Sequence, residues 1–221
     1  MSSVEKKDEK GNVLGILDID SLNRDNVMEA IIKELKPGMG KGIYIADAGE
    51  KKISQQTNYK AVEWTAGLTA LREKASPWEL SFPMDAELEN IQVYYGFDNL
   101  TNQEIDEMIE ESKRTGKHVV LRDLRPNHTL VGLSVTYNKG GRDFEFRIFG
   151  TTKSRIRLSD LEDYTYENVQ IRGNAAVYIG DGNKQQLIWI KMDSHDKALQ
   201  YEIITKDSDR DWVISIAETL L

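Results

Sequence analysis

The chain has 221 residues, of which 39% are hydrophobic and 30% are charged, and its formal net charge at pH 7 is −8. It contains no Cys, which excludes disulfides, thiolate zinc sites and cysteine nucleophiles. The acidic balance disfavours nucleic acids and anionic membrane surfaces as partners, because a polyanion gains little by binding to it. No apolar run approaches the roughly 18–20 residues that a membrane span needs.

The first third of the chain begins with the charged segment 1–12, which has almost nothing to bury and is expected to be a disordered leader. A short strand is predicted over Val13–Ile19, followed by a polar turn over Asp18–Asp25. Val27, Ile31 and Leu35 recur at helical spacing, and Lys36-Pro37-Gly38 ends that helix. A strand over Ile43–Ala46 is expected next, and residues 57–75 favour a helix only in their second half.

The middle of the chain contains a strand over Ile91–Tyr95 and then the clearest helix signal. Thr101 and Glu104 have the spacing of a capping box, in which each residue satisfies an exposed amide of the first turn. Ile105, Met108 and Ile109 form the apolar stripe, and Gly116 ends the helix.

From Val119 onward the hydrophobic period changes to two. A hairpin is predicted with its turn at Asn138–Arg142. Four further strands separated by polar turns predict a meander, over Val169–Ile171, Ala176–Ile179, Leu187–Met192 and Leu199–Ile204. Asp209 then caps a last amphipathic helix.

These patterns predict an α+β fold: an antiparallel meander sheet with amphipathic helices packed on one face, and the C-terminal helix closing the core. Charged side chains such as Glu145 and Arg147 are expected to face water on the other side of the sheet. After the leader, the predicted organisation is an N-terminal strand–helix region over 13–75 and a sheet-plus-helix domain over 76–221. One continuous domain over 13–221 is the alternative.

Known catalytic and metal-binding patterns do not account for the polar residues. His118, His128 and His195 are too widely spaced for a zinc site, so we expect no metal and no cofactor. Gly38, Gly40 and Gly42 form a GxGxG run, but it lies after a helix and before a strand, the reverse of a dinucleotide-binding motif. The sequence therefore predicts a protein that is not an enzyme.

Two groups of residues are candidate binding sites. Lys153, Arg155 and Arg157 alternate along one predicted strand face and could receive an anionic partner, although a solvated strand face has the same pattern. Tyr94 and Tyr95 belong to a set of aromatic residues, with Trp64, Trp78, Tyr164 and Tyr166, that lie near chain breaks or in short strands. Amphipathic rings in such positions often line a groove.

The C-terminal part of the chain carries one family resemblance. Its features are Val169-x-Ile171-x-Gly173, an aromatic strand ending at Tyr178, Leu187-Ile188-Trp189, Tyr201-x-Ile203 and Ile216-Ala217-x-x-Leu220, with a weaker match over Leu80–Tyr95. This part resembles a domain of unknown function of sporulating Gram-positive bacteria, where it forms the outer, C-terminal part of membrane-anchored anti-sigma-like proteins and lipoproteins. The chain departs from that pattern in lacking a membrane anchor and in its long turn Asp193–Lys197.

The resemblance implies a non-catalytic extracytoplasmic sensing or binding domain, the outer part of a membrane-anchored regulator or lipoprotein. Such a domain would be tethered through an anchor not present in this chain and would bind an unknown protein or an anionic ligand. An intracellular, cytoplasmic protein-interaction module is the alternative, and a hydrolase with a dispersed site is a third hypothesis.

Overall fold

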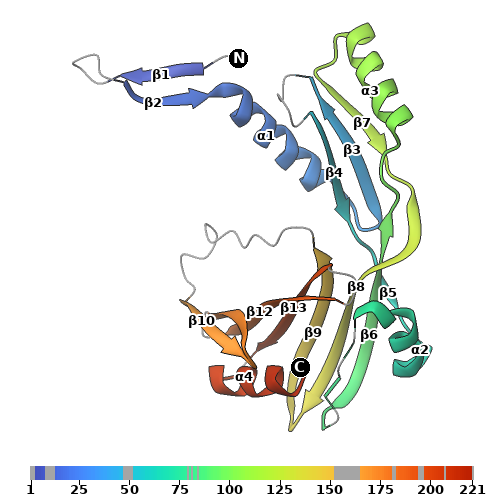
Figure 1. Cartoon of the computed structure of the whole chain (residues 1–221), viewed down its shortest axis with the longest axis vertical. Helices are drawn as coiled ribbons and strands as arrows, with labels where there is room; N and C mark the ends of the chain where they lie inside the picture. Colours follow the sequence, from blue (N-terminus) through green and yellow to red (C-terminus); the bar gives the residue numbers. More distant parts are fainter. Residues whose placement is uncertain are drawn as a thin grey trace. The chain divides into compact units, whose positions relative to one another are not determined.

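The structure is a computed structural model that describes residues 3–7, 13–46, 52–78, 80, 82–83, 85–151, 165–180, 183–193, 197–206 and 208–220, with the backbone only for 3–7, 13–25, 77 and 151. The chain forms two compact units (Figure 1). The first contains Met1–Lys60 and Tyr95–Thr129, and the second contains Ala61–Tyr94 and Leu130–Leu221. This division replaces the predicted boundary after residue 75, because segments far apart in sequence pair with one another.

The first unit contains a small antiparallel sheet with the strand order β4-β3-β7. Its elements are β1 (Ser3–Lys7), β2 (Val13–Asp18), α1 (Ile19–Glu34), β3 (Met39–Ile45), β4 (Ile53–Asn58), α3 (Asn102–Thr115) and β7 (Val119–Asp123). Helix α3 packs against β3 and β7, and its Met108 is buried with Tyr44 and Val120.

Two N-terminal predictions are corrected by these elements. Ser3–Lys7, within the expected disordered leader, is a strand that pairs antiparallel with β2. Strand pairing uses backbone groups that every residue carries, so a polar composition does not prevent it. Helix α1 begins at Ile19, directly after β2, so the polar residues expected to form a turn make the first turns of the helix.

The GxGxG run has a packing role in β3. An ideal Cβ placed on Gly42 would lie 2.5 Å from Leu100 Cδ1, and one on Gly40 would lie 3.1 Å from Phe97 Cδ1. Gly38 has φ +87°, a conformation that glycine adopts without strain. The glycines therefore make room for neighbouring side chains and a turn.

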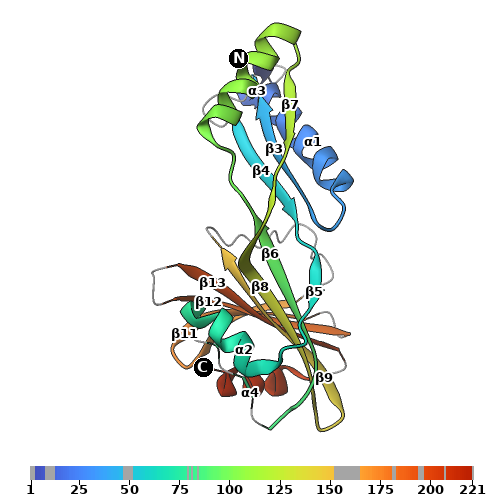
Figure 2. The same cartoon turned by 90° about the vertical axis from the view of Figure 1, so that its right-hand side faces the viewer.

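The second unit contains an eight-stranded sheet with the order β10-β11-β12-β13-β9-β8-β6-β5 among the described residues. The strands are β5 (Ala61–Glu63), β6 (Glu87–Phe97), β8 (Pro126–Lys139), β9 (Arg142–Thr151), β10 (Thr165–Ile171), β11 (Asn174–Gly180), β12 (Lys184–Met192) and β13 (Ala198–Lys206). Figure 2 shows α2 (Gly67–Lys74), and a 3₁₀ turn (Ser76–Trp78) follows it. Strands β6 and β8 each pass from one unit into the other.

The main core lies on one face of this sheet, which we call the core face. Alternate residues of neighbouring strands meet there, and the row Leu133, Ile148, Tyr201 and Trp189 crosses four strands. The rings of Trp189 and Tyr201 stack with centroids 5.4 Å apart. Because the side chains of a strand alternate between faces, this row fixes which residues lie on the other face.

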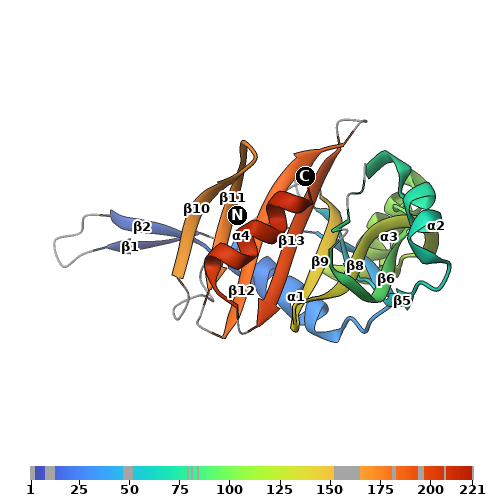
Figure 3. The same cartoon turned by 90° about the horizontal axis from the view of Figure 1, so that it is seen from below.

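Helix α4 (Arg210–Thr219) covers the core face along β12 and β13 (Figure 3). Asp209 caps it by accepting a hydrogen bond of 2.8 Å from the backbone N–H of Trp212. Val213, Ile216 and Ala217 are buried. The α+β class and the predominantly antiparallel pairing predicted from the sequence are confirmed.

Candidate functional site

The face of the large sheet opposite α4 carries a groove of about 700 Å³ over β10, β11 and β12. We call this surface the groove face. The side chains of alternate residues line it: Asn168, Gln170, Ala175, Val177, Ile188 and Ile190. All six belong to the second unit, so the groove is formed within one compact body.

Exposed hydrophobic side chains gather around this groove. Tyr166 is 61% exposed, Ile190 43% and Met192 53%, and the strand alternation places all three on the groove face. They are three of the seven large hydrophobic side chains exposed in the described part of the chain. An apolar surface that remains in contact with water on a charged protein is a candidate interaction site.

The groove is also uncharged. The groove-face positions over β10, β11 and β12 are Tyr166, Asn168, Gln170, Ala175, Val177, Ile179, Gln186, Ile188, Ile190 and Met192, and only Lys184, at the start of β12, adds a charge. Since 30% of the chain is charged, this stretch differs from the average surface. Its apolar and amide groups can desolvate without leaving a buried charge.

A charged belt lies beside the groove on the same face, over β8, β9 and β13. It consists of Ser134, Glu145, Arg147, Gln200 and Glu202. The row Ser134, Arg147, Glu202 and Ile188 crosses from belt to groove through four neighbouring strands. The polar character of the face therefore falls from β9 towards β12.

The centre of the belt is a two-point ion pair between residues of one strand. Arg147 Nε donates to Glu145 Oε1 at 2.7 Å and Arg147 Nη2 donates to Glu145 Oε2 at 2.6 Å. Ser134 Oγ also donates to Glu145. A bidentate pair of this kind fixes both side chains in one geometry.

The pKa values of this pair move away from neutrality. Burial by itself raises the pKa of Glu145, but hydrogen bonds from Arg147 and Ser134 and the charges of Arg147 and Lys184 offset it, leaving the pKa below its ordinary value. Burial lowers the pKa of Arg147, and the hydrogen bond and charge of Glu145 reverse that effect, so it ends raised. Both groups are therefore held in their charged forms at neutral pH.

Tyr94 extends the belt onto β6. Its ring centroid lies 5.0 Å from that of Phe149. The ring of Phe149 occupies the space above Gly132, where a Cβ would collide with it. Burial raises the pKa of Tyr94, while the charge of Arg147 acts in the opposite direction. Tyr94 is thus a half-buried aromatic wall at the polar end of the groove face.

A smaller hollow of about 490 Å³ lies at the end of the same face near the β8–β9 turn. Thr136, Asp143, Glu145, Ile204 and Lys206 contribute to its lining. Charged groups of both signs surround it, so it offers no single charge to a ligand.

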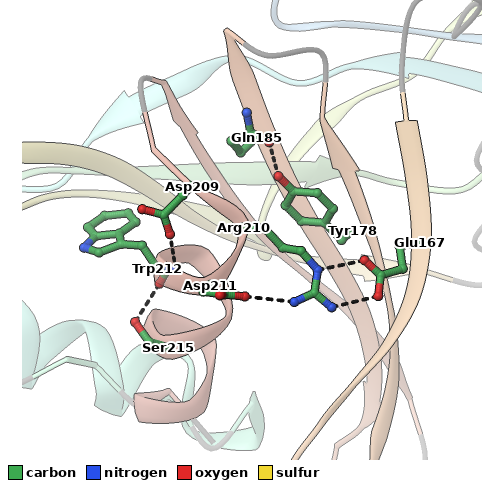
Figure 4. A network of polar contacts seen from close by, with 8 residues as sticks. All are labelled: Glu167, Tyr178, Gln185, Asp209, Arg210, Asp211, Trp212 and Ser215. Carbon is green, nitrogen blue, oxygen red and sulfur yellow. Dashed lines mark hydrogen bonds and ion pairs between the residues drawn. The ribbon is translucent and has the colours of Figure 1, made fainter.

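Strand β10 lies at the edge of the sheet beside the groove, and α4 holds it from the core face (Figure 4). Arg210 donates from Nε and Nη2 to the two carboxylate oxygens of Glu167, each at 2.7 Å. Its Nη1 lies 3.0 Å from Asp211. The hydrogen bonds from Arg210 lower the pKa of Glu167.

The structure separates the residues that the sequence suggested as a site. Tyr94 lies in the charged belt, whereas Tyr95 belongs to the first unit, where its ring meets His128 edge-on at 6.2 Å. The suggested cationic cluster of Lys153, Arg155 and Arg157 lies outside the described residues. Of the other aromatic candidates, Trp78 is buried and Tyr166 is exposed at the groove.

Sequence reasoning missed the apolar half of the site. Ile188 and Ile190 sit in the run LIWIKM, where both faces of the strand are hydrophobic. Such a run is typical of a strand covered on both sides. One signal in the sequence could have revealed it. The predicted helices cover only one face of the sheet, so the hydrophobic residues on the other face of this strand had no predicted cover.

Among the residues that the structure describes, no group of three or more His, Asp or Glu side chains could hold a metal ion. No helix in the same residues is long and apolar enough to cross a membrane. Comparisons of the chain with family models, curated proteins and solved structures find no match.

Proposed function

We propose that the chain is a non-catalytic sensing or binding domain whose groove face receives an uncharged, apolar segment of a protein partner. The observation that carries the proposal is the groove of about 700 Å³, lined by apolar and amide side chains and bordered by exposed Tyr166, Ile190 and Met192. The residues that line the groove carry no charge, which complements a partner segment that also lacks charge.

The charged belt supports binding rather than chemistry. Glu145 and Arg147 satisfy one another through two hydrogen bonds, and their pKa values are shifted away from neutrality in opposite directions. General acid–base catalysis works best with a group whose pKa lies near the working pH. The pair is better suited to setting the polar limit of a binding surface.

The first test uses Nile red, an uncharged apolar dye, as a probe of the groove in the full chain. We expect Ile190→Asp to weaken dye binding by tenfold or more, because a carboxylate in the groove must be desolvated. Leu121→Asp is a matched control, since Leu121 is also 43% exposed but lies in the first unit. Equal dye binding by both variants and the unchanged chain would contradict the proposed groove.

The extracytoplasmic location is part of the same proposal and rests on the C-terminal resemblance. It is tested by expressing an epitope-tagged copy of the complete native gene and treating intact cells with protease. Loss of the tagged protein from intact cells supports the outer location. Protection until the cells are lysed supports the alternative, a cytoplasmic interaction module.

A further inference from the structure

We infer that the partner segment binds as an added β-strand on the outer edge of β10, the edge that does not pair with β11. This inference rests on the proposed function and specifies how the groove is used. The occupant would be an extended, uncharged segment of another protein, held by backbone hydrogen bonds to β10 and by side chains placed over the groove.

The hydrogen-bonding pattern of β10 follows from its turn. Arg172 and Gly173 connect β10 to β11 with φ values of 45° and 85°, and Ile171 faces Asn174 across the two-residue turn. The residues that flank such a turn form a hydrogen-bonded pair, and the pairs then alternate. Thr165, Glu167, Val169 and Ile171 therefore direct their backbone groups to β11.

The intervening residues direct their backbone groups away from the sheet. These are Tyr166, Asn168 and Gln170, and within the described residues β10 pairs with β11 alone. The same three residues place their side chains on the groove face. An added strand would thus meet backbone donors and acceptors that have no strand partner in the described part of the chain, beside the groove that receives its side chains.

The sequence and pairing of β10 lack three of the features that often prevent strand addition, namely proline, lysine and a bulge. Its sequence TYENVQI contains no Pro and no Lys, and it pairs with β11 over seven residues without a bulge. At the other end of the sheet, β5 has only three residues, which is too short for an extended interface. Because β10 has seven residues and β5 has three, β10 is the edge strand that can pair with an extended partner segment.

The contact between Arg210 and Glu167 holds this edge in place before binding. Two hydrogen bonds of 2.7 Å tie the middle of β10 to the first residue of α4. Because the contact lies on the core face, it leaves the groove face and the outer edge accessible. A strand already held in its bound conformation loses less entropy when a partner pairs with it.

The test uses dodecapeptides selected on the full chain from a random phage library and resynthesised with a fluorescent label. We expect the selected peptides to be largely uncharged and to alternate apolar residues with a period of two. Asn168→Pro removes one outward N–H at an edge position where proline is tolerated, and should weaken peptide binding tenfold or more. Asn168→Ala keeps that N–H and changes only the groove lining, so it should weaken peptide binding less than Asn168→Pro does.

A second measurement does not depend on how Asn168→Pro folds. N-methylation of the peptide at alternate residues should abolish binding, while methylation at the intervening residues should leave it intact, because only one set of amides faces β10. Four results would each overturn strand addition. Both sets of methylated peptides could bind equally well, or Asn168→Pro could bind the peptides as tightly as the unchanged chain. The selected peptides could carry apolar residues at helical spacing, or the selection could enrich no peptide.

Two further outcomes separate this inference from the proposed function. If Ile190→Asp weakens Nile red binding but Asn168→Pro leaves peptide binding unchanged, the groove stands and strand addition fails. If the chain alone is a dimer by light scattering and Asn168→Pro makes it a monomer, the occupant of the edge is a second copy, which overturns the proposed foreign partner.

Discussion

Leu100 fills the space that a side chain on Gly42 would need: an ideal Cβ on Gly42 would lie 2.5 Å from Leu100 Cδ1 and 2.8 Å from its Cγ. Gly42→Ala should therefore destabilise the first unit by about 1–3 kcal/mol, the usual cost of overpacking a close contact. The measurement is urea unfolding followed by far-UV circular dichroism, because all four Trp residues belong to the second unit.

Two variants define the cause of that effect. Gly150→Ala is the matched control, because its Cβ would lie an ordinary 3.7 Å from the backbone oxygen of Val131. In the Leu100→Ala background, where the colliding side chain is gone, adding Gly42→Ala should lower the free energy of unfolding by less than it does in the unchanged chain. If Gly42→Ala costs the same in both backgrounds, the cost comes from the strand backbone and not from Leu100.

The capping box of α3 gives a second prediction. Thr101 Oγ1 accepts a hydrogen bond of 3.2 Å from the Glu104 N–H, and the Thr101 N–H donates one of 2.8 Å to the Glu104 carboxylate. Thr101→Ala should cost about 1 kcal/mol in the free energy of unfolding. Thr101→Ser keeps the hydroxyl and should lose much less. Equal losses in the two variants would argue against the cap.

The sequence located elements more reliably than it located surfaces. The Thr101–Glu104 spacing predicted the start of α3, and the period-two alternation around Phe144 and Phe146 predicted a half-buried strand, because both signals depend on residues close together in the chain. The groove depends on which strands become neighbours. Asn168, Val177 and Ile188 form one row only after β10, β11 and β12 have paired, and no local pattern records that.

The charged belt is half-buried for the same reason. Glu145 and Arg147 were expected to face water, and they do lie opposite the core face. However, their side chains are only 26% and 36% exposed, because they pack beside groups from other strands such as Ser134 and Tyr94. An alternation pattern identifies the face of a strand, but it does not show how far that face is covered.

The Glu145 carboxylate gives a prediction about pH. Its pKa in the folded protein lies below the ordinary value of 4.5, so its contribution is fully present above the ordinary pKa and is lost as the pH falls through the folded pKa. Glu145→Gln should cost about 1–2 kcal/mol near neutral pH, since it leaves the charge of Arg147 without its carboxylate in a partly exposed site.

The measurement compares the urea unfolding of the Glu145→Gln variant with that of the unchanged chain between pH 7 and pH 3, followed by Trp fluorescence. The difference in stability should shrink as the pH falls below 4.5. Glu218→Gln, on the exposed side of α4, is the control for removing a carboxylate. A difference that stays constant across this range would mean that the ionised form of Glu145 contributes nothing.

The contact between Arg210 and Glu167 should control the local stability of β10. Arg210→Lys loses the two-point geometry, because an ammonium group cannot match both carboxylate oxygens. We expect the amide hydrogens of Glu167 and Val169, which bond to β11, to exchange several-fold faster. Asp211→Asn removes the other partner of Arg210 and should leave their exchange unchanged. Equal acceleration in both variants would assign the effect to α4 as a whole.

The passage of β6 and β8 through both units has a consequence for dissecting this protein. Each unit is assembled from two separate stretches of chain, so no single cut can release either one whole. During synthesis on the ribosome, β8 can pair with β6 only after residues 95–129, which belong to the first unit, have been synthesised. A variant that lacks residues 95–129, or one with permuted termini, keeps both stretches of a unit in one chain, and we expect such variants to keep that unit intact.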